Sequence, residues 1–258
     1  SAGNVYFTDQ PNDRILRYDT TPGQANAKRM TVWMSPCGRS NGLFFANDQT
    51  LIACADEKNQ LWSIPIVDGR PGPPVVLVDD YQEQLLNGPN DCWVSADGAI
   101  YFTDPFYKRP YWQRGPSQQD AACVYRYDPE SKAVKRVADG FRQPNGIVGN
   151  PETGVVFIAD IGDQKTYRFK IDREGNLTQR KLFCNSGSDG MTLDEKGNLY
   201  LTGNPGVMVF NAEGQRIDTI AVPQSWTANV TFGGPERKTL FVTAKSGLYA
   251  IETKFRGL

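Results

Sequence analysis

Five short segments of the chain place an asparagine or aspartate directly before an apolar run. The segments are Asn41-Gly42, Asn90-Asp91, Asn145-Gly146, Asp189-Gly190 and Asn229-Val230. Amide and carboxylate oxygens are the ligands that hard cations such as calcium, magnesium and manganese prefer. One such pair alone is typical of a turn, because Asn and Asp tolerate left-handed backbone. Five of them at equivalent places favour a shared site, provided that the fold brings them to one point.

Composition limits the remaining chemistry. The 258 residues include no histidine, which excludes histidine-dependent triads and the usual zinc sites. The five cysteines are scattered and predict neither a zinc knuckle nor a disulfide framework. The net charge of −1 gives no basic footprint, and no apolar run approaches the ~18 residues of a membrane span, so we expect neither a nucleic-acid nor a membrane partner. Catalysis would depend on carboxylates, amides, Lys, Arg, Tyr or an oxygen-bound metal.

A β-type segment follows each of the five pairs, and a sixth stands at the start of the chain. These segments recur roughly every 40–56 residues, as expected of a propeller or solenoid. The segments cover residues 3–9, 50–56, 99–104, 155–160, 198–203 and 239–244. Six units of about four strands predict an all-β fold, a six-bladed β-propeller that forms a single domain over residues 1–258. A propeller gathers the starts of its inner strands around one axis, which would bring the five pairs together.

Two strands are missing from this pattern. The first inner strand is absent, because Ser1-Ala2-Gly3 already occupies the turn that should follow it. The last outer strand is absent as well, because the chain stops soon after the third strand of the sixth unit. We therefore expect the natural protein to carry roughly 20–40 further residues upstream, the length of one or two strands with their loops.

One connection, residues 105–122, is much longer than its counterparts and is aromatic and basic. It should lie on the face where the inner strands begin and overhang the central mouth, although a surface insertion that shields a blade edge is the alternative. The residues that we assign to substrate binding are Asn41, Asp104, Tyr107, Arg109, Trp112 and Asn229. Tyr107, Arg109 and Trp112 would stack on or hydrogen-bond a substrate, with ordinary loop roles as the alternative. The aspartates that end the second strands, Asp9, Asp56, Asp104 and Asp160, are otherwise expected to cap turns.

Several motifs resemble the gluconolactonase family, which includes senescence-marker protein (regucalcin) and luciferin-regenerating enzyme. They are RSNGLFF (39–45), LNGPNDCWVSADGAIYFTDPFY (86–107), QPNGIVGN (143–150), SDGMTLDEKGNLYLT (188–202) and ANVTFGGPERKTLFVT (228–243). The resemblance covers essentially the whole chain and implies a six-bladed propeller with a central divalent metal. It implies that Asn145 and Asp189 bind the metal and that Asn90 lies on the metal or on its bound water and substrate. Asp189, aided by Asn90, would then be the catalytic acid/base.

The resemblance also implies a reaction, the hydrolysis of a sugar γ- or δ-lactone to the aldonic acid by a lactonase-type hydrolase. Calcium is the favoured ion, with magnesium, manganese and zinc as alternatives. The family's first metal ligand is a Glu in an EGP-type motif on the first inner strand, and this chain has no matching position. The site would hold fewer anionic ligands and bind its ion more weakly.

Two other functions remain open at this stage. One is a metal-dependent esterase or phosphotriesterase that uses the same propeller site, since site chemistry and not fold decides function. The other is a non-catalytic propeller that binds a ligand or partner. In each case we expect a soluble protein of bacterial type, cytoplasmic or periplasmic, that is a monomer or a homodimer.

Overall fold

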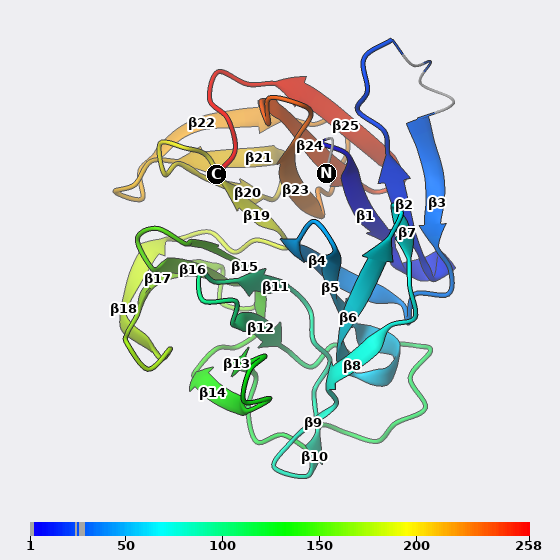
Figure 1. Cartoon of the computed structure of the whole chain (residues 1–258). Coiled ribbons are helices and arrows are strands. Elements are labelled where there is room, and N and C mark those ends of the chain that lie inside the picture. The colour runs from blue at the N-terminus through cyan, green and yellow to red at the C-terminus, as the bar shows by residue number, and fades with distance from the viewer. Residues whose placement is uncertain (1–2, 24, 26–28) are drawn as a thin grey trace.

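The computed structural model describes residues 3–23, 25 and 29–258, so Ser1 and Ala2 of the expected first turn lie outside the described residues. The described chain forms six antiparallel sheets around a common centre (Figure 1). None of its helices is long and apolar enough to cross a membrane. The prediction of an all-β six-bladed propeller is confirmed.

The six sheets, or blades, follow one another along the chain. Blade 1 contains β1 (Val5–Asp9), β2 (Arg14–Tyr18) and β3 (Met30–Met34), and blade 2 contains β4 (Ser40–Asn47), β5 (Thr50–Ala55), β6 (Gln60–Val67) and β8 (Val75–Val78). Blade 3 contains β11 (Cys92–Val94), β12 (Ile100–Asp104), β13 (Cys123–Tyr127) and β14 (Val134–Ala138). Blade 4 contains β15 (Pro144–Asn150), β16 (Val155–Asp160), β17 (Lys165–Ile171) and β18 (Leu177–Cys184). Blade 5 contains β19 (Met191–Leu193), β20 (Leu199–Thr202), β21 (Gly206–Phe210) and β22 (Arg216–Ala221), and blade 6 contains β23 (Asn229–Gly233), β24 (Thr239–Ala244) and β25 (Gly247–Glu252).

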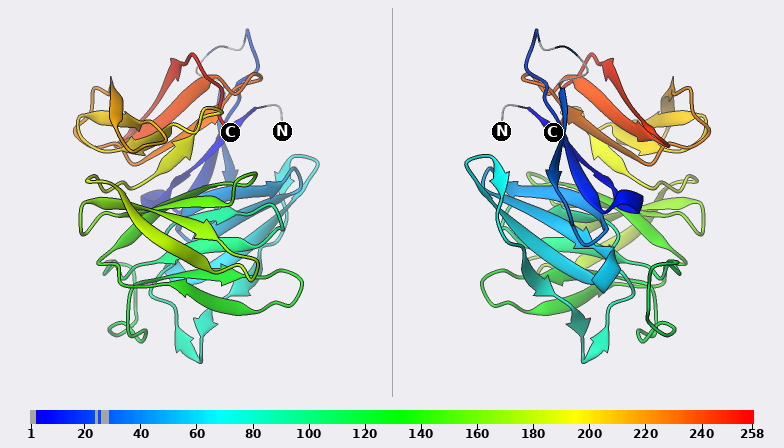
Figure 2. Two further views of the ribbon diagram at one scale, coloured as in Figure 1. Left: turned by 90° about the vertical axis from the view of Figure 1, so that its left-hand side faces the viewer. Right: turned by 90° about the vertical axis from the view of Figure 1, so that its right-hand side faces the viewer.

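The sequence pattern did not predict the smaller elements. The short strand β7 (Arg70–Pro71) pairs with β6, and β9 (Asp80–Tyr81) and β10 (Gln84–Leu85) form a hairpin. This hairpin projects from the body of the propeller (Figure 2). Two 3₁₀ turns, η1 (Gln10–Asn12) and η2 (Asp56–Lys58), follow the second strand position of blades 1 and 2.

Blades 1 and 6 each contain three strands within the described residues, as predicted. They pack directly on one another. The backbone N–H of Gly234 donates to the carbonyl of Gly3 at 2.9 Å, and the rings of Tyr18 and Phe241 lie 5.6 Å apart. These contacts join the two ends of the ring.

The core lies between the blades. Every residue of β12 and of β16 is buried, because each blade packs against neighbours on both of its faces. Such strands read as short continuous apolar runs, without strict alternation. The largest apolar cluster joins blades 3, 4 and 5, and a second cluster joins blades 2 and 3. Burial between blades therefore fixes the position of each blade around the centre.

The strand register places the candidate residues at one end of the ring. The start of an inner strand pairs with the end of the second strand, as Ser40 does with Ala55 and Pro144 with Asp160. The inner strands contact one another in the order β4, β11, β15, β19 and β23. The five Asn or Asp starts therefore share one mouth with the connections that leave the second strands.

Candidate functional site

Neighbouring inner strands touch through their backbones at the positions of the Asn and Asp pairs. The N–H of Gly42 donates to the carbonyl of Asn90 at 2.7 Å. A methyl group on Gly42 would lie 2.8 Å from that carbonyl oxygen, and one on Gly190 would overlap the side chain of Asn229. These two glycines therefore permit close approach between blades, a need different from the turn geometry that the pairs also suggest.

Asn145 presents an oxygen without a hydrogen-bond partner at this mouth. The residue lies buried at the start of β15, and its Nδ2 donates to the Tyr107 hydroxyl at 2.7 Å. Its Oδ1 is buried and accepts no hydrogen bond from the described residues. A buried acceptor without a partner costs free energy and asks for an explanation such as an ion. The Asn145 oxygen therefore fits the role of a cation ligand.

Asp189 supplies the carboxylate beside Asn145. Burial raises the pKa of Asp189 to about 6, while the side chains of Asn145 and Trp226 and the charge of Arg109 oppose this increase. A cation in contact with the carboxylate would stabilise its ionised form further. The environment therefore favours a positive charge next to Asp189.

Two backbone hydrogen bonds fix the position of Asn90. It is buried, its N–H donates to the carbonyl of Thr103 at 2.9 Å, and its own carbonyl accepts from Gly42. Blade 3 thus holds Asn90 against the inner strand of blade 2, at the same mouth as Asn145 and Asp189.

One carboxylate and two amide oxygens form a donor set that suits a hard cation. The described residues contain no group of three or more His, Cys, Asp or Glu side chains that could hold a metal. Blade 1 also contributes no strand inside β1 within the described range. The residues present therefore fit a divalent cation such as calcium.

The remaining two of the five inner-strand starts, Asn41 and Asn229, form hydrogen bonds with neighbouring protein groups. The carbonyl of Asn41 accepts a hydrogen bond from Oγ1 of Thr8 at 3.0 Å. The side chain of Asn229 turns to its own strand, where its Oδ1 accepts the N–H of Val230 at 2.8 Å. Both residues lie at the starts of inner strands, as predicted, and their contact with a substrate stays a prediction.

Asp104 is a structural cap, which corrects its assignment to substrate binding. It is fully buried at the end of β12. Its Oδ2 accepts the N–H of Asn87 at 2.9 Å, and its Oδ1 accepts the N–H of Gly88 at 2.7 Å. Both oxygens are thus used to hold the segment that leads to Asn90.

The three loop candidates divide between the mouth and blade 2. Tyr107 lies at the mouth, where it contacts Asn145. Arg109 and Trp112 instead bind Asp56, the first through Nε to Oδ2 at 2.8 Å and the second through Nε1 to the backbone carbonyl at 2.8 Å. The expectation that Asp56 caps a turn is wrong, because its carboxylate binds this distant loop.

Two neighbours of the site were missed in the sequence. Asp91 accepts the N–H of Cys92 at 2.9 Å and that of Ile147 at 3.2 Å, and so bridges β11 and β15. Burial, together with the charge of Asp189, raises the pKa of Asp91 to about 7. The side chain of Trp226, in the connection before β23, opposes the increase in the pKa of Asp189. Asp91 was visible in the Asn90-Asp91 pair, whereas no repeat signal marks Trp226.

Known proteins share both the sequence pattern and the fold. The model of the SMP-30/Gluconolactonase/LRE-like region matches residues 1–246. A pentonolactonase of Haloferax volcanii is 28% identical over 256 residues, which cover 94% of this chain and 78% of that protein. A gluconolactonase of Zymomonas mobilis is 28% identical over 201 residues, which cover 70% of this chain and 55% of that protein.

The chain thus spans about half the length of the first curated relatives that it matches. A solved gluconolactonase of Xanthomonas campestris superposes with a TM-score of 0.85 at 26% identity, covering 96% of this chain and 82% of that one. Because the family model matches nearly all of its residues, this protein belongs to the SMP-30/gluconolactonase/LRE-like family, whose members among its relatives include lactonases.

Proposed function

We propose that this protein is a divalent-metal-dependent lactonase that hydrolyses a sugar γ- or δ-lactone to the aldonic acid, with calcium as the preferred ion. The observation that carries the proposal is the buried Asn145 Oδ1, which has no partner among the described residues and lies beside the Asp189 carboxylate. These oxygens occur at the mouth of a propeller whose relatives include lactonases.

Asn145, Asp189 and Asn90 would hold the cation. When bound, it would supply Lewis-acid polarisation of the lactone carbonyl and stabilise the negative charge that develops on its oxygen. Asp189 would accept a proton from water as that water attacks the carbonyl carbon, and would return it to the ring oxygen when the C–O bond breaks. The Tyr107 hydroxyl accepts from Asn145, so its own hydrogen remains for donation to a sugar oxygen.

The test uses the purified chain, stripped with a chelator and then titrated with calcium, and follows acid release from glucono-δ-lactone. Calcium should restore turnover, and Asp189→Asn should reduce kcat/KM by at least about 100-fold, the usual scale for a general base. Asp194→Asn is the matched control. Asp194 is also buried, and it accepts the Tyr200 hydroxyl at 3.1 Å in a turn on the opposite face.

The outcome separates the remaining functions. If Asp189→Asn leaves calcium binding and turnover unchanged, the assigned site is wrong. Faster hydrolysis of a phosphotriester or an aryl ester than of any aldonolactone would assign the other esterase chemistry. Calcium-dependent binding of lactone without acid release would assign a non-catalytic role.

A further inference from the structure

The connection between β12 and β13, which we call the aromatic loop (residues 105–122), is fastened to blade 2 mainly at Asp56, whose carboxylate binds three side chains and whose backbone carbonyl accepts from Trp112. Oδ2 of Asp56 accepts the Nε–H of Arg109 at 2.8 Å, the hydroxyl of Tyr111 at 2.5 Å and the Nε2–H of Gln10 at 3.2 Å. The Asp56 side chain is only 3% exposed. Bonds to a buried charged group are stronger than average, about 1.5–3 kcal/mol each.

Asp56 lies one residue beyond the capping position of its blade, which Ala55 holds at the end of β5. In that blade the N–H groups of Cys37 and Arg39 both donate to Oδ1 of Asp13, which belongs to blade 1. In blades 3 and 4 the corresponding N–H groups are bound by the blade's own strand-end aspartate, Asp104 or Asp160. Asp13 thus does the capping in blade 2, while the Asp56 carboxylate binds a distant segment.

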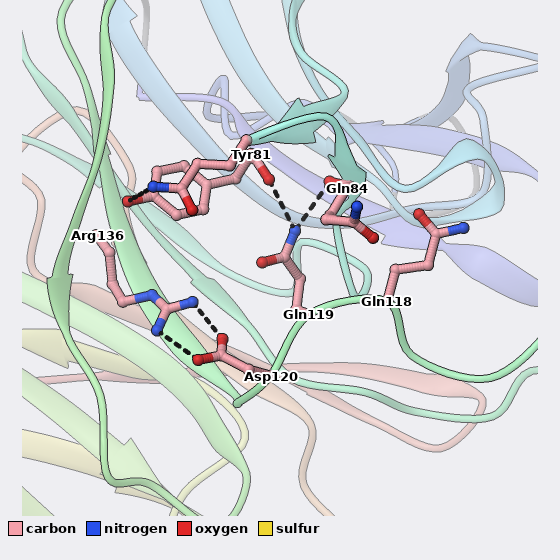
Figure 3. Close-up of a pocket in the computed structure, with 7 residues that line it drawn as sticks. Tyr81, Gln84, Gln118, Gln119, Asp120 and Arg136 are labelled. Atoms are coloured by element: carbon pink, nitrogen blue, oxygen red, sulfur yellow. Dashed lines mark hydrogen bonds and ion pairs between the residues drawn. The ribbon is translucent and has the colours of Figure 1, made fainter.

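The other end of the aromatic loop is fixed to the β9–β10 hairpin (Figure 3). The N–H of Leu85 donates to Oε1 of Gln118 at 2.7 Å, and Nε2 of Gln119 donates to the carbonyl of Gln84 at 2.8 Å. A polar crevice of about 330 Å³ opens here. Its side chains bind one another, as Arg136 binds Asp120. These hydrogen bonds anchor the second end of the aromatic loop to the hairpin, so the loop is held at both ends.

The anchored loop carries Tyr107 to the candidate active site. The Arg109 guanidinium lies over the Tyr107 ring, 4.9 Å from its centroid. The same arginine is the one that Asp56 binds, so a continuous set of contacts runs from Asp56 through Arg109 and Tyr107 to Asn145. Because Tyr107 accepts from the Nδ2 of Asn145, the Oδ1 of Asn145 is left to face a cation at the mouth.

We propose that Asp56 is a positioning residue, which latches the aromatic loop over blade 2 and thereby keeps Tyr107 on Asn145 at the mouth. The latch would set the affinity for the substrate more than the rate of the chemical step, because Asp56 touches no reacting atom. The link to substrate affinity rests on the proposed lactonase function, whereas the latch itself does not.

The first experiment tests the latch without any substrate. In Asp56→Asn, amide hydrogen exchange in residues 105–112 should accelerate at least about tenfold, which corresponds to about 1.4 kcal/mol of lost local stability. Exchange in β16, on the far side of the site, should stay unchanged. Asp194→Asn is the matched control, and it should leave residues 105–112 as protected as in the wild type. Unchanged exchange of the loop in Asp56→Asn would overturn the latch.

The second experiment tests the transmission to the site. Asp56→Asn should raise KM for glucono-δ-lactone about tenfold while kcat changes less than about threefold, the signature of lost binding that is shared by ground state and transition state. In a Tyr107→Phe background the same substitution should change KM less than about threefold, because the two residues act through one contact. Equal effects in the two backgrounds would overturn the positioning role.

A wild-type chain without lactonase activity would refute only the proposed function. The transmission is then measured as calcium affinity, which should fall in Asp56→Asn and fall no further when Tyr107→Phe is added. Additive losses of calcium affinity would count against the positioning role in that case too.

Discussion

Two aspartates stand one position apart in neighbouring blades and bind different partners. Asp104 is the last residue of β12 and pairs with Cys123, whereas Ala55 holds the corresponding position in β5 and pairs with Gln60. Asp104, at the end of β12, uses each carboxylate oxygen to hold one backbone N–H of its own blade. Asp56, directly after β5, holds side chains of a loop that starts in blade 3. The difference follows from the register, because Ala55 stands where blade 3 has Asp104, and Asp13 of blade 1 binds the N–H groups of Cys37 and Arg39. A shift of one residue along the repeat thus separates a carboxylate that caps its own blade from one that binds a distant loop.

The largest expected contrast is in the pH dependence of stability. Burial raises the pKa of Asp104 from 3.8 to about 7. A folded-state pKa above the unfolded value gives stability that is complete below about pH 4 and lost as pH rises through about 7. Three pH units at about 1.4 kcal/mol each make this roughly 4 kcal/mol. The pKa of Asp56 is also raised by burial, but Arg109 opposes the increase, so its contribution should be smaller.

Urea unfolding of the wild type, Asp104→Asn and Asp56→Asn between pH 4.5 and 8 measures this contrast. The stability advantage of the wild type over Asp104→Asn should shrink steadily with pH, more than its advantage over Asp56→Asn. Asp91, whose pKa is raised to about 7 as well, is present in all three proteins and cancels in the differences. A steeper pH effect at Asp56 would reverse the comparison.

A second prediction concerns Asp160, which caps blade 4 as Asp104 caps blade 3. Its Oδ2 accepts the N–H of Arg142 and its Oδ1 that of Gln143, both at 2.8 Å. An asparagine can accept at only one of these positions, so Asp160→Asn should lower the free energy of unfolding by about 2 kcal/mol. The shift in urea midpoint at constant m-value checks this. A loss below about 0.5 kcal/mol would show that the two-oxygen cap is not needed.

The smallest effect is expected at Asp13. Both of its bonds, to the N–H groups of Cys37 and Arg39, go to one oxygen, Oδ1. An asparagine retains that oxygen and tolerates the backbone of Asp13, whose φ is 50°. Asp13→Asn should therefore change stability by less than about 0.5 kcal/mol, within the usual range of surface substitutions. Asp13→Ala should cost about 1–2 kcal/mol in the same urea assay, because the two N–H groups lose their acceptor.

The repeat pattern was enough to predict the propeller, the incomplete first and last blades and the shared mouth, because these follow from periodicity. The unusual length of the aromatic loop also predicted that it reaches the mouth, where Tyr107 contacts Asn145. Periodicity says nothing about contacts between blades that occur once. The cap that Asp13 of blade 1 provides to blade 2 is such a contact, and so is the approach of Trp226 to Asp189. The role of Asp104 was open in the sequence because a cap and a ligand need the same carboxylate.

The contact at Gly42 has a consequence for altering the ion preference of the protein. The N–H of Gly42 meets the carbonyl of Asn90 there, so the spacing of β4 and β11 is set by main-chain atoms and not by the side chain of Asn41. Exchanging the amide of Asn41 for an acid would thus alter the electrostatic character of the mouth without changing the spacing of these two strands. Such a scaffold separates valence from size, the two quantities by which binding sites discriminate between ions.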